Sequence, residues 1–141
     1  MTENIPERSE FDSVDPAPPS EGKNISNLRN TLCDENEKMF QRMRALFALR
    51  NIGGKESVDA LAAAYSSQSA LLKHEIAYVM GQMQDSNAVP HLIDRLEDKE
   101  EDIMVRHEAA EALGAIGDRT ALSVLEKFVD DDEVVIAESC E

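Results

Sequence analysis

Two His-Glu dipeptides in this sequence carry side chains that can bind a metal ion, and they lie at a regular spacing. They are His74-Glu75 and His107-Glu108, and the corresponding residues are 33 apart. Two imidazoles with one or two carboxylates suit iron(II) or manganese, and two histidines with one carboxylate are the usual ligands of non-haem iron that activates oxygen. Zinc also binds histidine and carboxylate, so the residue types leave the choice among these metals open.

The segments around the two dipeptides predict amphipathic helices at equivalent places in a structural repeat. Apolar residues recur at steps of three and four in 71–85 and in 104–118, which is the helical period. Gly81 and Gly114 are also 33 residues apart, and their lack of a side chain would let neighbouring helices approach closely. Equivalent helices of successive repeats lie about 10 Å apart, so we expect both histidines to reach one ion.

The flanking repeats lack the dipeptide, which is therefore not a general feature of the repeat. The corresponding positions hold Met43-Arg44 and Ala137-Glu138. The third histidine, His91, has no glutamate beside it, and we interpret it as a partly exposed helix residue.

The rest of the chain predicts further helices and no strand. The segments with helical periodicity are 24–34, 37–51, 55–67, 86–96, 120–129 and 133–141. Outer and inner helices alternate at 31 to 33 residues per pair, which predicts an all-α solenoid of HEAT-like helical hairpins with about four repeats, the last incomplete. The apolar side chains of 133–141 would lack a neighbour, so we expect further chain or a second molecule to cover that end.

Composition separates an N-terminal tail from one repeat domain. Residues 1–23 hold four of the five prolines among serines and acidic residues, with too few apolar side chains to offset the entropy of ordering. We expect this tail to be disordered and 24–141 to form the repeat domain. Aromatic residues make up only 4% of the chain, a composition that stacked helices rich in alanine and leucine tolerate.

The charge balance excludes some partners. With 29 acidic and 14 basic residues the formal net charge is −15, which argues against nucleic acid because phosphate binding needs clusters of lysine and arginine. The acidity suits a cationic substrate or partner, although solubility alone also explains it. No apolar run is long enough to predict a membrane span. Two isolated cysteines and the absence of a signal segment predict a cytoplasmic protein.

Longer stretches around the dipeptides carry a family resemblance. The chain resembles deoxyhypusine hydroxylase, also called deoxyhypusine monooxygenase, in SALLKHEIAYVMGQMQDSNAVPHLIDRLED and in MVRHEAAEALGAIGD. The resemblance covers residues 24–141. It implies a HEAT-repeat protein of two similar halves, each supplying two His-Glu motifs to a di-iron centre. It also implies hydroxylation, with molecular oxygen, of the deoxyhypusine side chain of eukaryotic translation initiation factor 5A.

Carried over by residue, the resemblance implies that His74, Glu75, His107 and Glu108 are metal ligands. Glu75 and Glu108 would be the catalytic residues, and either could bind a substrate amine instead of the metal. The third and fourth motifs have no counterpart here. The sequence is therefore similar to an N-terminal half, which could hold one iron and would need the C-terminal half, or a second copy of the chain, for a di-iron site.

Two other functions remain open from the sequence. A HEAT-type scaffold would bind a protein on its concave surface without chemistry, and it would retain no iron. An inactive remnant of the hydroxylase would keep the ligands and lack the reaction. Metal content and oxygen-dependent hydroxylation distinguish these two from the enzyme.

Overall fold

The computed structural model describes residues 18–19 and 24–129, and all the regular elements within these ranges are helices. This confirms the all-α prediction. By its internal contacts the chain divides into two compact units, Met1–Ser66 and Ser67–Glu141, each of which is described by itself. Most of the predicted tail and the predicted helix 133–141 lie outside the described residues, so both stay predictions, as does the domain boundary at residue 23.

Among its described residues, the first unit contains three α-helices and one 3₁₀ turn. They are α1 (Ile25–Cys33), α2 (Met39–Ile52), α3 (Gly54–Ala63) and η1 (Ala64–Ser66). Helix α1 packs against both α2 and α3. The fully buried large side chains of this core are Leu32, Leu46, Leu49, Val58 and Leu61.

The boundary between α2 and α3 follows from its glycines. Gly53 has φ +70° and caps α2, with its amide donating to the carbonyl of Leu49 at 3.1 Å. A side chain disfavours this left-handed backbone, and glycine adopts it without strain. The helix predicted over 37–51 therefore ends within one residue of the predicted place, and α3 begins at Gly54.

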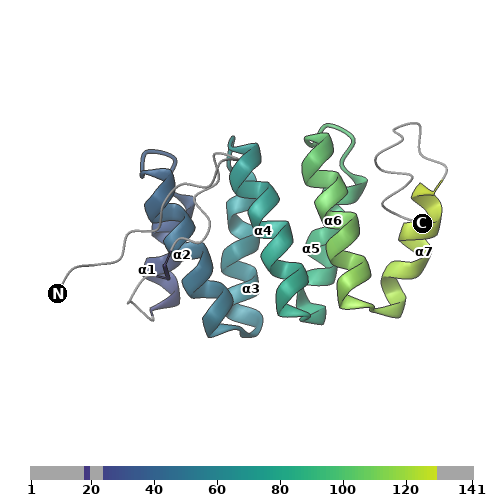
Figure 1. Cartoon of the computed structure of the whole chain (residues 1–141), viewed down its shortest axis with the longest axis horizontal. Helices are drawn as coiled ribbons and strands as arrows, with labels where there is room; N and C mark the ends of the chain where they lie inside the picture. Colours follow the sequence, from purple (N-terminus) through teal and green to yellow (C-terminus); the bar gives the residue numbers. More distant parts are fainter. Residues whose placement is uncertain (1–17, 20–23, 130–141) are drawn as a thin grey trace. The chain divides into compact units, whose positions relative to one another are not determined.

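The second unit contains the two helices that carry the His-Glu dipeptides. Its elements are α4 (Ala70–Met83), η2 (Ser86–Ala88), α5 (Val89–Glu97), α6 (Ile103–Ile116) and α7 (Arg119–Phe128). Helices α4 and α6 pack side by side, as the repeat predicts, and α5 packs against α6 (Figure 1). Leu72, Ile76, Met80, Leu92, Leu96 and Leu113 are its fully buried large side chains.

The segment predicted as one helix over 86–96 has two parts. A 3₁₀ turn comes first, because the Asp85 carboxylate accepts the amide of Asn87 at 2.9 Å and tightens the chain there. The α-helix begins at Val89, with Pro90 in its first turn, where the missing N–H removes no hydrogen bond.

A capping serine determines where α4 begins, and a glycine determines how closely α4 approaches α6. Ser69 caps α4 by accepting the amide of Leu72 at 3.1 Å. A Cβ added to Gly81 would lie 3.1 Å from Cα of Ala112 on α6, so this glycine does permit a close approach. A Cβ on Gly114 would meet no described atom within 4 Å, and its role in packing stays a prediction.

Within the described ranges, none of the helices combines the length and the apolar character that crossing a bilayer requires.

Candidate metal centre

Helices α4 and α6 bring one residue of each His-Glu dipeptide into contact. Nε2 of His74 lies 3.0 Å from Oε2 of Glu108. The Glu108 side chain is largely buried, at 11% exposed, and the His74 side chain is about one-third exposed, at 34%. The contact therefore lies at the edge of the α4–α6 interface, open to solvent on the histidine side.

The pairing follows from the rotation of residues along a helix. Successive residues are about 100° apart, so His107 and Glu108 leave α6 in different directions. Glu108 faces α4 and is buried, whereas His107 lies at the margin with its side chain 25% exposed. As a result His74 meets the carboxylate of the other dipeptide rather than its imidazole.

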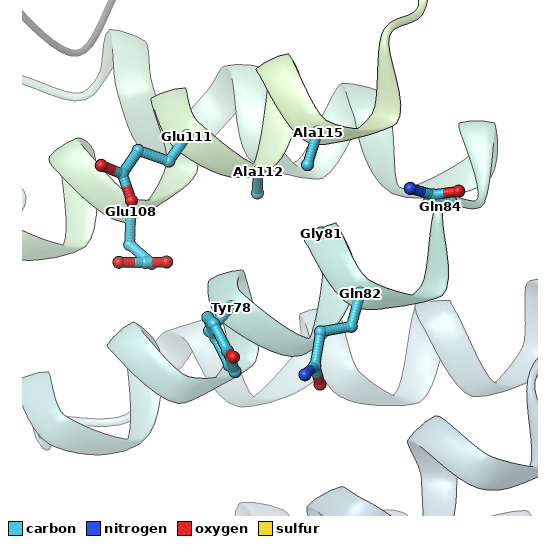
Figure 2. Close-up of a pocket in the computed structure, with 8 residues that line it drawn as sticks. All are labelled: Tyr78, Gly81, Gln82, Gln84, Glu108, Glu111, Ala112 and Ala115. Carbon is cyan, nitrogen blue, oxygen red and sulfur yellow. The ribbon is translucent and has the colours of Figure 1, made fainter.

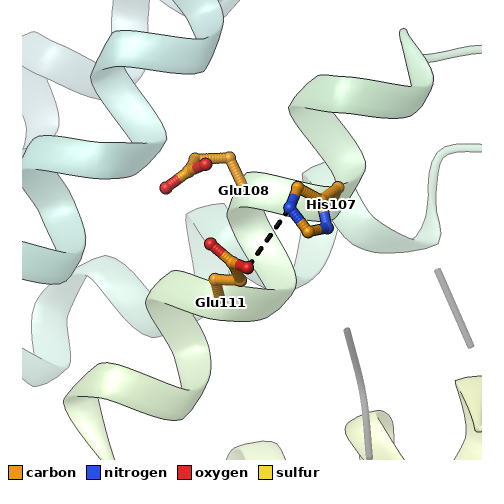
Figure 3. Close-up of side chains that lie close together, drawn as sticks. All are labelled: His107, Glu108 and Glu111. Carbon is orange, nitrogen blue, oxygen red and sulfur yellow. Dashed lines mark ion pairs between the residues drawn. The ribbon is translucent and has the colours of Figure 1, made fainter. Parts of the chain in front are cut away.

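The other histidine pairs within its own helix. Nε2 of His107 lies 3.2 Å from Oε1 of Glu111, one turn further along α6 (Figure 3). Ligand atoms of His107, Glu108 and Glu111 all lie within 4.8 Å of one another, a group that could hold a metal ion. Glu108 belongs to both arrangements and therefore links the two histidines.

Glu111 is a candidate ligand that the sequence analysis did not identify. The four-residue separation from His107 was a usable signal, since such residues are neighbours on a helix surface. Glu75, a predicted ligand, is half-buried on α4 and is not part of the three-residue group. The predicted ligand set of His74, Glu75, His107 and Glu108 stays a prediction.

The carboxylates around His74 favour its protonated form. The hydrogen bond to Glu108 is the main cause that raises the pKa of His74. Partial burial opposes the shift, and the charges of Glu108, Glu75 and Glu111 add to it. A metal ion bound by Nε2 of His74 and Oε2 of Glu108 would have to displace the proton that their 3.0 Å contact shares.

A cavity adjoins this acidic group. It has a volume of about 340 Å³ and lies between α4 and α6. Figure 2 shows Glu108 and Glu111 at one end of it and Gln84 at the other. Tyr78, Gly81, Gln82, Ala112 and Ala115 complete the lining. The cavity is therefore acidic at one end and mostly apolar or neutral along its length.

Known proteins similar to this chain agree with the fold. The family described as HEAT repeats matches residues 25–104 and 66–141. Deoxyhypusine hydroxylase of Xenopus laevis is 53% identical over 136 residues, which are 96% of this chain and 45% of that protein. Deoxyhypusine hydroxylase of Homo sapiens is 51% identical over 129 residues, which are 92% of this chain and 43% of that protein.

A solved structure gives the same result in three dimensions. The structure of human deoxyhypusine hydroxylase in complex with glycerol matches with a TM-score of 0.86 at 49% sequence identity. The match covers 96% of this chain and 47% of that one. The chain thus spans about half the length of the curated relatives it matches. The predicted solenoid of helical hairpins and the predicted resemblance are both confirmed, and the chain belongs to the family of HEAT-repeat proteins.

Proposed function

We propose that this chain provides half of a non-haem iron site that hydroxylates the deoxyhypusine side chain of translation initiation factor 5A. The observation that carries the proposal is the 3.0 Å contact between His74 on α4 and Glu108 on α6. It joins the two His-Glu dipeptides in a chain that is similar to deoxyhypusine hydroxylase over nearly all its length.

The residues present fit an iron ion. His74, His107 and Glu108 are the two-histidine, one-carboxylate set that iron(II) prefers, with Glu75 and Glu111 as further carboxylates nearby. When bound, iron would supply the activation of molecular oxygen that lets one oxygen atom enter a C–H bond. The chain's own part is to hold the ligands in a partly buried site and to leave a side open to the cavity.

The cavity suits the proposed substrate. Deoxyhypusine is a lysine extended by an aminobutyl group, so it is a long aliphatic chain with two amines. Glu108 and Glu111 would attract an ammonium group at one end of the cavity. Ala112, Ala115 and the ring of Tyr78 would contact the methylene groups and exclude water from them.

A complete centre needs a second set of ligands. The chain covers only 45% of its Xenopus laevis relative, and it contains two of the four His-Glu motifs that the resemblance implies. We assign the remaining ligands to the other half of the enzyme or to a second copy of this chain. The two isolated cysteines favour a reducing compartment, so we place the protein in the cytoplasm.

Iron content tests the ligand assignment. The purified chain should bind iron(II) under anaerobic conditions, and His74→Ala and His107→Ala should each lose the ion while keeping the helical circular dichroism of the parent. His91→Ala is the matched control, because His91 is a half-buried histidine on α5 outside the ligand group. Equal iron content in all four proteins would contradict the assignment.

Turnover tests the need for a second half. Deoxyhypusine-bearing factor should be hydroxylated when the chain is mixed with the missing half of a curated relative, and hardly at all by the monomeric chain. Full turnover by a strictly monomeric chain would contradict the half-site model. Retained iron without turnover in any mixture would instead identify an inactive remnant.

A bulky side chain tests the cavity. Ala115→Phe should fill part of the cavity and raise the KM for the substrate without reducing the iron content, because Ala115 is exposed and supplies no ligand. Ser123→Phe adds a phenyl ring at an exposed site on α7 outside the lining, and it should leave KM unchanged. An unchanged KM in Ala115→Phe would place the substrate elsewhere.

A further inference from the structure

Glu101 is a buried acidic residue in the loop between α5 and α6, outside the group of candidate ligands. Its side chain is only 2% exposed. One carboxylate oxygen accepts from Nζ of Lys73 at 2.6 Å and from the amide of Asp102 at 2.8 Å. The other accepts from Nη1 of Arg95 at 2.9 Å. These donors stabilise the buried charge, and they make α4, α5 and the start of α6 converge on one carboxylate.

This carboxylate lies beside the chain segments that orient the candidate ligands. Lys73 directly precedes His74 on α4. Asp102 is the N-cap of α6, and its side chain accepts the amide of Met104 at 2.8 Å. Further along both helices, α4 approaches α6 closely where Gly81 faces Ala112. Along α4, the contact between His74 and Glu108 therefore lies between the Lys73–Glu101 ion pair and the close approach at Gly81.

We propose that Glu101 is a positioning residue that fixes the first turn of α4 against α6 and thereby keeps His74 in contact with Glu108. A shift of one residue along a helix moves a side chain by about 1.5 Å and turns it by about 100°. A hydrogen bond tolerates only a few tenths of an ångström. Anchoring the residue next to His74 therefore fixes where its imidazole lies.

The first unit provides a matched control for the role of Glu101. The loop before α2 contains Glu37, whose carboxylate accepts the amide of the next residue, Lys38, at 2.9 Å. The same local bond joins Glu101 to Asp102. The Glu37 side chain is more exposed than that of Glu101, and this local bond is the side-chain hydrogen bond that the two glutamates have in common. Glu37→Gln therefore changes the same kind of turn at a site remote in sequence from the candidate ligands.

The deciding measurement uses the chain without metal at one fixed pH. Isotope-labelled histidine gives separate imidazole signals by NMR, and with three histidines in the sequence the assignment needs only single substitutions. In the parent, the His74 signal should show an Nε2–H hydrogen-bonded to Glu108. Glu101→Gln should lose that signature, and Glu37→Gln should keep it. Retention in both variants, or loss in both, would overturn the inference.

Metal affinity gives a second readout, which rests on the proposed iron site. Loss of a group that orients ligands commonly weakens binding about 10-fold or more, and we expect that loss in anaerobic iron(II) titrations of Glu101→Gln but not of Glu37→Gln. If the parent chain binds no iron, the proposed function fails, and the NMR measurement on metal-free protein still decides the role of Glu101.

Two variants of Lys73 separate positioning from a general loss of folding. Lys73→Arg keeps a cation beside Glu101 and should retain both the His74 signature and the affinity. Lys73→Met keeps the length and the apolar contacts of the side chain, and it should lose both while circular dichroism shows a folded protein. A His74 signature that is unchanged in folded Lys73→Met would also overturn the inference.

Discussion

The hairpin of α1 and α2 in the first unit and the hairpin of α5 and α6 in the second are built alike, yet only the second carries candidate ligands. In both, a buried arginine on the later helix donates to a carbonyl ten residues earlier. Nε of Arg42 lies 2.8 Å from the oxygen of Leu32, and Nε of Arg106 lies 3.0 Å from that of Leu96. Each bond joins the first turn of the later helix to the C-terminal end of the earlier helix, at equivalent positions of the two hairpins.

The loops of the two hairpins also share their hydrogen bonds. The amide of Glu37 donates to the carbonyl of Asp34, and the amide of Glu101 donates to that of Asp98, both at 3.1 Å. In each loop the aspartate side chain accepts the amide two residues on, at 2.9 Å. The backbone of the repeat is therefore independent of the chemistry that the later helix carries.

The difference lies in the residue after the arginine. Met43 follows Arg42 and is buried, at 3% exposed, whereas His107 follows Arg106 with its side chain 25% exposed. The position after the arginine therefore contributes to the core in one hairpin and to a candidate site in the other. Because the hairpin does not need a histidine there, metal binding and stability should respond separately to substitution.

The largest effects should come from removing these two side chains. Met43→Ala leaves a cavity in the first core and should lower the free energy of unfolding by about 2–5 kcal/mol without changing iron binding. His107→Ala should abolish iron binding and cost about 1 kcal/mol or less, since it removes one partly exposed pair within a helix. Urea denaturation and metal analysis of both variants check this, and iron loss in Met43→Ala would break the distinction.

The two loop glutamates should differ by a smaller amount. Glu101→Gln leaves Lys73 and Arg95 without their shared carboxylate and should cost about 3 kcal/mol, the lower end for breaking a buried ion pair. Glu37→Gln disturbs only a local bond in a more exposed loop, so we expect about 0.5 kcal/mol or less. Urea denaturation at neutral pH measures both, and equal losses would show that the loops are energetically alike.

Acid should reduce the difference between these two variants. Burial opposes the ionisation of Glu101, but hydrogen bonds from Lys73, the Asp102 amide and Arg95 outweigh it, so the pKa of Glu101 is lowered from its ordinary value of 4.5. The stability that its charge contributes is complete above the ordinary value and is lost as the pH falls through the lowered one. The advantage of the parent over Glu101→Gln should shrink over that range, and an advantage independent of pH would rule out ionisation as its source.

The sequence predicts the arrangement of helices well because the repeat determines it. A spacing of 33 residues placed His74 and His107 on neighbouring helices, and the structure has α4 beside α6. The ends of α2 and α4 were also predictable, since Gly53 and Ser69 have local reasons to end or begin a helix. Periodicity and capping depend on neighbours in sequence, which are visible without a structure.

The pairing of side chains across α4 and α6 could not be predicted in this way. Which carboxylate meets His74 depends on the rotation and offset of the two helices at less than one turn. The contacts that set this offset join residues far apart in sequence, such as Lys73 with Glu101. A repeat pattern indicates which face a residue occupies, and it does not indicate that the partner of His74 is Glu108 rather than His107.

The smallest effects concern one position of the repeat. It is occupied by Gly81 in α4, by Gly114 in α6 and by Arg50 in α2. Gly81→Ala would place a Cβ 3.1 Å from Cα of Ala112, so the helices must separate slightly, and we expect a loss of about 1 kcal/mol. Gly114→Ala meets no described atom within 4 Å and should gain about 0.5–1 kcal/mol from helix propensity. Thermal unfolding of the two variants measures both signs. A loss in Gly114→Ala as large as that in Gly81→Ala would mean that α6 is packed on a further neighbour just as α4 is packed on α6.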